Sequence, residues 1–386
     1  MTNSLLATII TIVVMMGVLQ GACAYLIYVE RKLAAYMQDR IGPNRVGPFG
    51  LLQPIADGLK FLFKEEVIPG HVDIFLFLLA PAVAVGTATL AFAVVPFGPT
   101  TLTGGDPLPY QFVIAPGVDI GILFVFAIGS LAVYGIILGG YASNNKYSFL
   151  GALRSSAQIV SYEIPLGMSI LGVVIFAGSL NLERIIDDQV HHGWNIFYQP
   201  LAFVLFMASV LAECNRLPFD LPEAEQELIG GYHTEYSALK FGLFFLGEYT
   251  HVITTSLILS ILFLGGWHFP WITEVGGFAG IVLKVLVIWA KALGFILFYM
   301  LIRWTIPRFR FDQLMGLAWK VLIPLALFNL LAVIAVMETH ASKWWLLPIS
   351  VLLVVGAAAF SLTLPAGPKR RMDLVARQEQ SAAVAP

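Results

Sequence analysis

The stretch LLATIITIVVMMGVLQGACAYLIYV occupies residues 5–29, and Glu30 behind it is the first charged residue of the chain. A helix needs about 20 apolar residues to cross roughly 30 Å of bilayer hydrocarbon, so this stretch is long enough to span a membrane. Eight further stretches are similarly apolar, at 72–97, 117–141, 159–180, 196–212, 239–266, 280–303, 318–337 and 344–364. The sequence therefore predicts an all-α polytopic membrane protein with about nine transmembrane helices.

The composition of the whole chain agrees with this fold class. Of the 386 residues, 58% are apolar and 12% are charged, whereas soluble proteins carry about 25% charged residues. A transmembrane β-barrel is excluded because its strands alternate in polarity, which runs such as 330–337 do not. The loops are too short for a separate soluble domain. We expect one helical membrane domain at 1–365 and a polar, disordered cytoplasmic tail at 366–386.

Few residues suit a metal or a redox centre. The two cysteines, Cys23 and Cys214, lie in different stretches, and the seven histidines form no HxxH or HExxH pair. These facts exclude a self-contained iron–sulfur cluster and a disulfide framework, although a haem held by two histidines on separate helices stays open. There is no phosphate-binding glycine loop, nucleophile elbow or nucleic-acid signature. We expect this chain alone to bind no metal and no cofactor.

The positive charges predict the orientation of the chain. With nine spans, the odd-numbered loops and the C-terminal tail lie on one side and carry fifteen lysines and arginines, against two in the even-numbered loops. Cytoplasmic loops are enriched in these residues. The N-terminus is therefore expected outside and the C-terminus in the cytoplasm. The first stretch has no positive residue before it, so it is expected to be a retained helix and not a cleaved signal peptide.

The first inner loop contains a second kind of helix. Within Leu51 to Glu66, polar residues recur at helical spacings of 4, 3 and 4, and apolar residues fill the opposite side. This pattern predicts an amphipathic helix in the membrane interface. One interpretation is a surface anchor; the other is that the helix walls an opening for a lipid-like molecule. The polar residues are Gln53, Asp57, Lys60 and Lys64.

Ionisable residues also occur inside predicted spans, where charge is costly and indicates an ion or proton path by default. Glu163 precedes Pro165 by two residues, and proline is expected to open the helix beside it. Glu248 and His251 are one helical turn apart and should share a face. Lys284 and Lys291 in the next span also share a face. The alternatives are a snorkelling Glu163 and static salt bridges that only fix helix packing.

The inner segment from 212 to 236 is the richest in carboxylates, although inner loops usually favour positive charge. Neighbouring carboxylates can share protons near neutral pH, so this segment is interpreted as handling protons. A solvated acidic face is less favoured because the neighbouring prolines and Phe219 would be exposed with it, and no recognised spacing supports a divalent-cation site. The acids are Glu213, Asp220, Glu223, Glu225, Glu227 and Glu235, with Arg216 among them.

At these loops the sequence resembles a known family, the membrane subunit that forms the quinone chamber of respiratory complex I. The resemblance is colinear over about 5–340, and the ninth span and tail resemble the longer bacterial versions. It is carried by Glu30-Arg31-Lys32, the run QDRIGPNRVGP at 38–48, QPIADGLK at 53–60, residues 147–163, residues 212–236, and PRFRFDQLM at 307–315.

This resemblance implies a non-redox subunit of a proton-translocating NADH:quinone oxidoreductase, not catalytic alone, in a bacterial inner membrane or alternatively a mitochondrial one. It implies ubiquinone or menaquinone as substrate, an iron–sulfur cluster in a peripheral-arm subunit, and contacts with the quinone-site subunit, other membrane subunits and lipid, but no nucleic acid. The implied quinone chamber comprises Gln38, Arg40, Arg45, Gln53, Asp57, Lys60, Arg216 and Phe219. The implied proton path comprises Glu163, Glu213, Glu223, Glu225, Glu227, Glu235 and Glu248.

Three alternatives remain at this level. The membrane subunit of an energy-converting hydrogenase is similar and needs no quinone. A stand-alone ion antiporter would share the intramembrane acids. A purely structural anchor would tolerate loss of Glu163 or Glu213.

Overall fold

A computed structural model describes residues 5–99, 111–220, 230–272 and 274–363 of the chain, and these residues form helices and no strands. Seven helical segments are long and apolar enough to cross a membrane, and two shorter helices are also apolar. The long ones are α1 (Leu5–Met37), α3 (Ile74–Ala91) with the turn η2 (Phe92–Val94), α4 (Gly121–Ala142), α5 (Lys146–Ala177), α10 (Ala238–Leu264), α11 (Gly277–Thr305), and α12 (Phe311–Leu317) continuing through η4 (Ala318–Leu322) into α13 (Ile323–Glu338).

The two shorter apolar helices are α8 (Pro200–Glu213) and α14 (Leu346–Thr363), the latter preceded by η5 (Lys343–Trp345). Each of the nine predicted stretches thus coincides with an apolar helix, which confirms the all-α polytopic membrane fold. The amphipathic helix is confirmed as α2 (Gln53–Phe63), and a short turn η1 (Pro48–Gly50) precedes it. The remaining elements are α6 (Leu182–His192), α7 (Asn195–Tyr198) and η3 (Gly231–His233).

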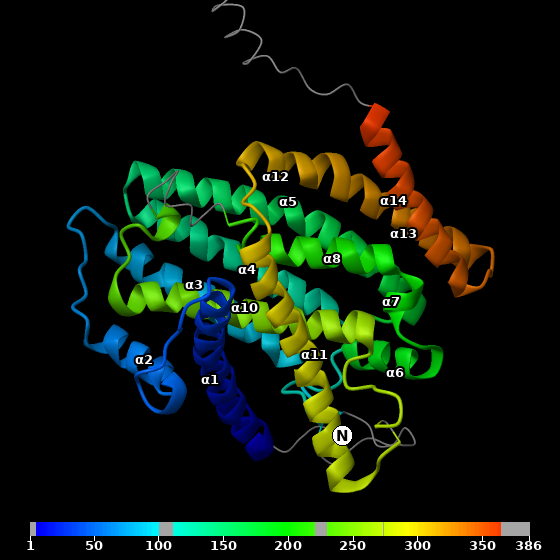
Figure 1. The fold of residues 1–386 in the computed structure, drawn as a ribbon, viewed down its shortest axis with the longest axis horizontal. Coiled ribbons are helices and arrows are strands. Elements are labelled where there is room, and N and C mark those ends of the chain that lie inside the picture. The colour runs from blue at the N-terminus through cyan, green and yellow to red at the C-terminus, as the bar shows by residue number, and fades with distance from the viewer. Residues whose placement is uncertain (1–4, 100–110, 221–229, 273, 364–386) are drawn as a thin grey trace, which may run out of the picture.

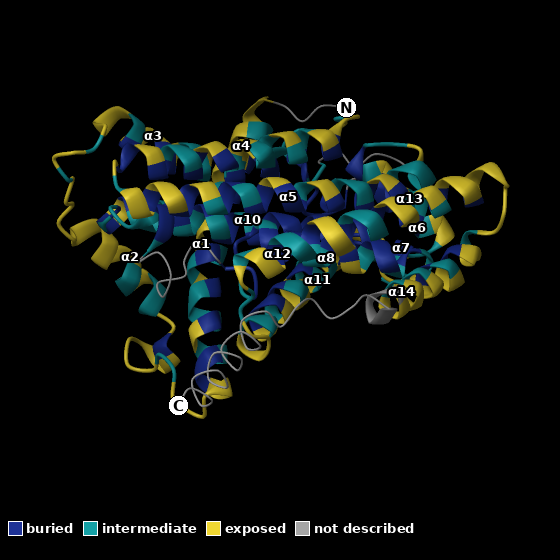
Figure 2. Ribbon diagram, turned by 90° about the horizontal axis from the view of Figure 1, so that it is seen from above, coloured by how far each residue is buried: buried dark blue, intermediate teal, exposed yellow. Residues whose placement is uncertain are grey.

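The arrangement of the helices places α10 in the middle of the protein. In Figure 1, α4, α5, α8 and α10 run nearly parallel across the view, while α1 and α11 cross their direction. Of the apolar part of α10, 78% is buried inside the protein, against 17% for α1 and 28% for α11. Figure 2 shows α2 and α14 at opposite ends of the molecule, with many exposed residues on both. Helix α10 is therefore the core element around which the others pack.

Helix α5 begins earlier than predicted. The sequence suggested a span at 159–180 with 147–154 in a connecting loop, but the helix starts at Lys146, where the Asn145 side chain accepts a hydrogen bond from the Tyr147 N–H. The first turns escaped prediction because small and polar residues, not large apolar ones, face the interior there. Gly151 packs so closely on η3 that a Cβ would lie 2.7 Å from the Gly231 Cα.

The expected opening of this helix at Pro165 is wrong. Pro165 is buried and lies inside α5, and the helix continues on both sides of it. A proline removes one backbone hydrogen bond, but neighbouring helices and hydroxyl side chains can compensate within a membrane protein. Glu163 therefore projects from a continuous helix.

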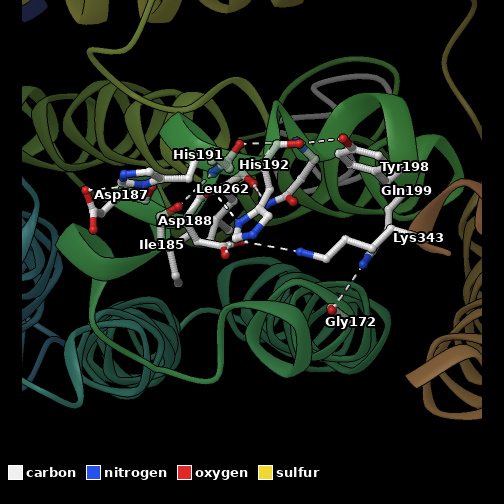
Figure 3. A network of polar contacts seen from close by, with 12 residues as sticks. Gly172, Ile185, Asp187, Asp188, His191, His192, Tyr198, Gln199, Leu262 and Lys343 are labelled. Atoms are coloured by element: carbon white, nitrogen blue, oxygen red, sulfur yellow. Dashed lines mark hydrogen bonds and ion pairs between the residues drawn. The ribbon is translucent and has the colours of Figure 1, made fainter. Parts of the chain in front are cut away.

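The connection between α5 and α8 contains the helix α6, which the sequence analysis missed. Its apolar residues Leu182, Ile185 and Ile186 are buried, and its other face carries His191 and His192. In Figure 3, each histidine lies near the aspartate four residues before it, and Lys343 of η5 approaches Asp188. The distances are 4.0 Å for His191–Asp187, 2.8 Å for His192–Asp188 and 3.8 Å for Lys343–Asp188. The missed signal is the helical spacing of the apolar residues Leu182, Ile185, Ile186 and Val190.

Candidate functional site

A cavity of about 520 Å³ lies between α1, α2, α10 and the end of α11. Its volume is within the range of roughly 300–1,000 Å³ that is usual for sites holding small molecules. Much of the wall is apolar, including Ile27 on α1, Phe61 on α2 and Phe245 on α10. The polar lining residues include two groups joined by direct contacts, Arg31 with Gln53 and Asp57, and Glu30 with Arg303; Gln20, Tyr28 and Arg40 are also in the lining. The cavity is therefore amphipathic, and α2 forms one of its walls.

Helix α2 is held to α1 by polar contacts beside this cavity. Arg31 of α1 donates to Asp57 of α2 at 2.6 Å, and Gln53 donates to the other oxygen of Asp57 at 2.9 Å. Farther along, Tyr28 donates to the carbonyl of Phe49 at 2.7 Å. The connection between α1 and α2 is thus fixed at the point where α2 begins.

A buried ionic cluster adjoins the cavity and is centred on Glu30, a residue that the sequence analysis did not place in the site. Arg303 of α11 forms an ion pair with Glu30, Tyr249 of α10 donates to it at 2.6 Å, and Arg216 lies 3.6 Å away. The Arg216 guanidinium also lies over the Tyr249 ring, 4.2 Å from its centroid. Buried carboxylates need such partners because an unpaired charge is costly in the interior.

A second cavity, of about 60 Å³, contains three of the predicted ionisable residues. Glu213 at the end of α8, together with Glu248 and His251 of α10, lines it. His251 Nε2 lies 3.4 Å from Glu213 Oε1, and Tyr232 donates to Glu248 at 3.3 Å. The prediction that Glu248 and His251 share a face is confirmed. Glu213 Oε2 is buried and has no hydrogen-bond partner among the described residues. We refer to this second cavity as the acidic pocket.

Glu163 lies next to the acidic pocket. It accepts a hydrogen bond from Ser130 of α4. The neighbouring residue, Gly129, lines the acidic pocket, and a Cβ there would lie 3.7 Å from Glu213 Oε1. The packing of α4 against α5, α8 and α10 thus brings Glu163, Glu213 and Glu248 to the same region, although they come from three different helices.

The segment that follows α8 is positioned by α5, through a residue that sequence reasoning missed. The buried Gln158 amide donates to the carbonyls of Ala212 at 2.8 Å and Phe219 at 2.7 Å. A glutamine inside a long apolar helix was the available signal, because a buried amide needs partners. Two acids of the predicted inner segment are also paired: Glu235 accepts from Asn145 at 2.6 Å, and Asp220 lies 3.2 Å from Arg308.

The predicted chamber residues divide into three groups. Arg40, Gln53 and Asp57 line the large cavity, and Arg216 lies in the ionic cluster beside it. Gln38, Arg45 and Lys60 do not line the cavity, and Gln38 accepts from Arg40 at 2.7 Å. Phe219 also lies elsewhere, buried between the rings of Tyr162 and Phe309 at 5.4 and 5.7 Å.

Of the predicted proton path, Glu223, Glu225 and Glu227 lie outside the described residues.

The two intramembrane lysines make contacts of another kind. Lys291 donates to three backbone carbonyls at the end of α10, those of Leu264, Gly266 and His268, at 2.6, 2.9 and 2.6 Å. Lys284 lies 5.2 Å from the centroid of the Trp267 ring. Within 5–99, 111–220, 230–272 and 274–363, no group of three histidine, cysteine or acidic residues is arranged to hold a metal ion.

The fold and these two sites define a polytopic helical membrane protein with an amphipathic cavity, an ion-pair cluster centred on Glu30 beside it, and a buried acidic pocket. A family model described as NADH dehydrogenase matches residues 9–334. An H-type subunit of the NADH-quinone oxidoreductase of Geobacter metallireducens is 52% identical over 309 residues, which is 80% of this chain and 89% of the relative. The H-type subunit of Thermomicrobium roseum is 50% identical over 326 residues, with 82% and 92% covered.

A third relative, an H-type subunit of the same enzyme from Cytophaga hutchinsonii, is 49% identical over 309 residues, covering 80% of this chain and 90% of its own length. The chain belongs to the family of H-type subunits of NADH-quinone oxidoreductase. It is accordingly one subunit of an oxidoreductase complex, has the other subunits of that complex as partners, and is not catalytic alone. Helix α14 lies beyond the part that the family model matches.

Proposed function

We propose that this chain forms the membrane part of a quinone-binding chamber and couples quinone reduction to proton translocation through its buried glutamates. The observation that carries the proposal is the 520 Å³ cavity, whose apolar lining residues suit an isoprenoid tail and whose polar lining residues suit a quinone headgroup. The names of the relatives support quinone as the substrate. The electrons would come from an iron–sulfur cluster in a peripheral-arm subunit.

The contacts suggest how the two cavities communicate. Glu30, Tyr249 and Arg303 line both the large cavity and a small void of about 20 Å³ beside Arg216. Arg216 follows Glu213 by three residues, and Glu213 lines the acidic pocket. A change of charge on the quinone would alter the balance of the Glu30 ion pairs, and Arg216 would carry that change toward Glu213. Coulomb interactions are strong enough for this because they are weakly screened in the interior.

The acidic pocket supplies groups that can hold and pass protons. Glu213 with His251, Glu248 with Tyr232, and Glu163 with Ser130 each pair a carboxylate with a group able to exchange a proton. Glu223, Glu225, Glu227 and Glu235 would extend this set toward the cytoplasm. The proton path would therefore start at the inner segment and continue to the buried acids between α4, α5 and α10.

The inner face suits docking of the peripheral-arm subunits. Ile41 and Phe49, in the first inner loop, are 82% and 77% exposed although they are large and apolar. Such residues indicate an interaction surface when they occur together outside the hydrocarbon. Gln38, Arg45 and Lys60 belong to the same region and would contribute to the chamber from this side. We place the N-terminus outside and the C-terminus in the cytoplasm of a bacterial inner membrane.

The test is photolabelling of the whole complex with a photoreactive quinone analogue that carries a long tail, followed by mapping of the labelled peptides. We expect labels within 20–61 or 241–249, and an excess of unmodified quinone should compete them away. Labels confined to 181–195 or 265–276 would refute the chamber. A complete lack of specific labelling would likewise refute it.

A further inference from the structure

Helix α2 forms one wall of the large cavity but buries little of its surface against the rest of the protein. None of its residues is buried, and all of the segment 64–73 that connects it to α3 is exposed except for Pro69 and Val72, which are partly buried. Its contacts are with α1 and α10. A wall with so little buried surface depends on its specific polar contacts for a fixed position.

The start of α2 has such contacts through Arg31 and Tyr28, but the far end is held from α10. Lys240 donates to Glu66 at 2.7 Å, and its side chain is only 10% exposed while that of Glu66 is 41% exposed. Beside this pair, Ser237 Oγ accepts from the Val67 N–H at 3.2 Å and donates to the Val67 carbonyl at 3.3 Å. We refer to these two contacts, Lys240–Glu66 and Ser237–Val67, as the α10 tether.

The α10 tether lies close to the part of the cavity where α2 and α10 face each other. Phe61 of α2 and Gly242 of α10 both line the cavity, and a Cβ on Gly242 would lie 3.7 Å from the Phe61 ring. A methyl group on residue 242 would therefore just contact the ring, so the two helices lie close together here with no side chain from Gly242 between them. The width of this part of the cavity is set by where the tether holds α2.

We infer that Lys240 and Ser237 are positioning residues that fix the far end of α2 and so shape the part of the cavity that holds the apolar tail of the quinone. Neither residue lines the cavity, so they act through α2 and not by touching the substrate. The inference rests on the proposed function. It adds that tail recognition and headgroup chemistry depend on different contacts of this chain.

The test compares steady-state kinetics of the whole complex with a long-tailed quinone and a tail-less quinone. In Lys240→Met and in Glu66→Gln, the KM for the long-tailed quinone should rise roughly fivefold while kcat stays close to wild type. The KM for the tail-less quinone should not change. Because the two residues act through one pair, the double variant should be no worse than the more damaging single variant. Lys64→Met and Glu65→Gln, which remove neighbouring exposed charges, are the matched controls.

A second measurement keeps the inference open to refutation if Lys240→Met fails to assemble. A spin label at Phe63→Cys reports on the end of α2, where Phe63 is 85% exposed and the native Cys23 and Cys214 are buried. Its mobility should rise in the Glu66→Gln background and not in Glu65→Gln. Unchanged mobility, or equal changes in KM for both quinones, would overturn the tether. If photolabelling fails but the spin-label mobility rises in the Glu66→Gln background, the proposed quinone chamber is refuted while the role of the α10 tether is supported.

Discussion

At the scale of residues, the buried acids differ because their partners differ. Glu163 accepts from a hydroxyl, Glu213 lies beside a histidine, and Glu248 accepts from a tyrosine. Glu30 instead has two arginines near it and is held as a charged group. The first three acids therefore have hydroxyl or imidazole partners, whereas Glu30 is the centre of an ion-pair cluster.

Glutamine at Glu163 or Glu248 keeps the shape of the side chain and removes its exchangeable proton. We expect each complex to assemble, with quinone reduction coupled to proton pumping lowered by about tenfold or more, since positioned acid–base groups contribute roughly 10²–10⁴ in rate. The measurement is quinone reductase activity and proton uptake in proteoliposomes that contain the whole complex. The exposed Glu338 offers the control Glu338→Gln. Undiminished activity and pumping in both variants would assign these acids a structural role.

Arg216→Ala removes a cation that is close to Glu30 and stacked on Tyr249. Loss of one partner from a buried ion pair typically costs about 3–5 kcal/mol, so this variant should lower thermal stability more than loss of a surface arginine. We expect an assembled complex with reduced quinone turnover. Arg216→Lys keeps the charge but not the planar stacking and should be intermediate. Turnover equal to wild type in an assembled Arg216→Ala complex would contradict a role for this residue.

His233 provides a prediction about pH. Burial lowers the pKa of His233 to about 4, and the rings of Tyr232 and Phe241 lie 4.9 and 5.2 Å away. Between about pH 6.5 and pH 4 the unfolded chain takes up a proton that the folded chain does not, so stability should fall as pH falls through this window. The loss approaches about 3 kcal/mol at the lower end. Thermal denaturation at about pH 7 and about pH 4.5 should show a smaller difference in His233→Phe; an equal difference would be evidence against this assignment.

At the scale of elements, α10 links the two sites. Residues 241–249 of this helix contribute to the large cavity, and Glu248 and His251 contribute to the acidic pocket. Its C-terminal carbonyls are satisfied from three other elements, by Gln189 of α6, Asn195 of α7 and Lys291 of α11. This arrangement fixes the end of α10 that lies away from the cavity, because helix-terminal carbonyls lack partners within the helix.

Lys291→Met should loosen that end of α10. The three backbone carbonyls that accept hydrogen bonds from Lys291 would lose this donor, and each unsatisfied buried acceptor costs about 1–3 kcal/mol of stability. We expect a lower melting temperature of the complex and faster amide hydrogen exchange in 260–268, with smaller effects on exchange in 238–245. Lys320→Met, at an exposed lysine, is the control. Exchange in 260–268 at the wild-type rate would show that Lys291 does not stabilise the helix end.

At the scale of the whole molecule, the chain is one part of a larger assembly. Ile41 and Phe49, between α1 and α2, are large apolar residues that are mostly exposed. We therefore predict that purification in mild detergent brings the other subunits of the complex with it. The isolated chain in liposomes should show no cation-driven proton flux, because in the proposed function proton movement is triggered by quinone reduction in the whole complex. Flux from the isolated chain would instead support the antiporter alternative.

The nine apolar helices and the amphipathic helix α2 could be predicted from the sequence alone. Spanning length and helical periodicity are local properties, so 5–29 predicts a span whatever packs against it. The same holds for Glu248 and His251, whose shared face follows from their spacing. In the acidic segment 212–236, the sequence identifies the carboxylates but does not determine what each of them does. Three of them, Glu223, Glu225 and Glu227, lie outside the described residues.

Only the tertiary structure decided which of these groups meet. Glu30 was the first charge in the chain, yet its pairing with Arg303 joins residues 273 positions apart. Phe219 was expected in the chamber but is packed in the core, and α5 began earlier because small residues face a distant loop. Periodicity states which side of a helix is apolar, but not which helix covers it. That choice depends on how several helices pack together, and their packing fixes the cavity, the ion-pair cluster and the acidic pocket.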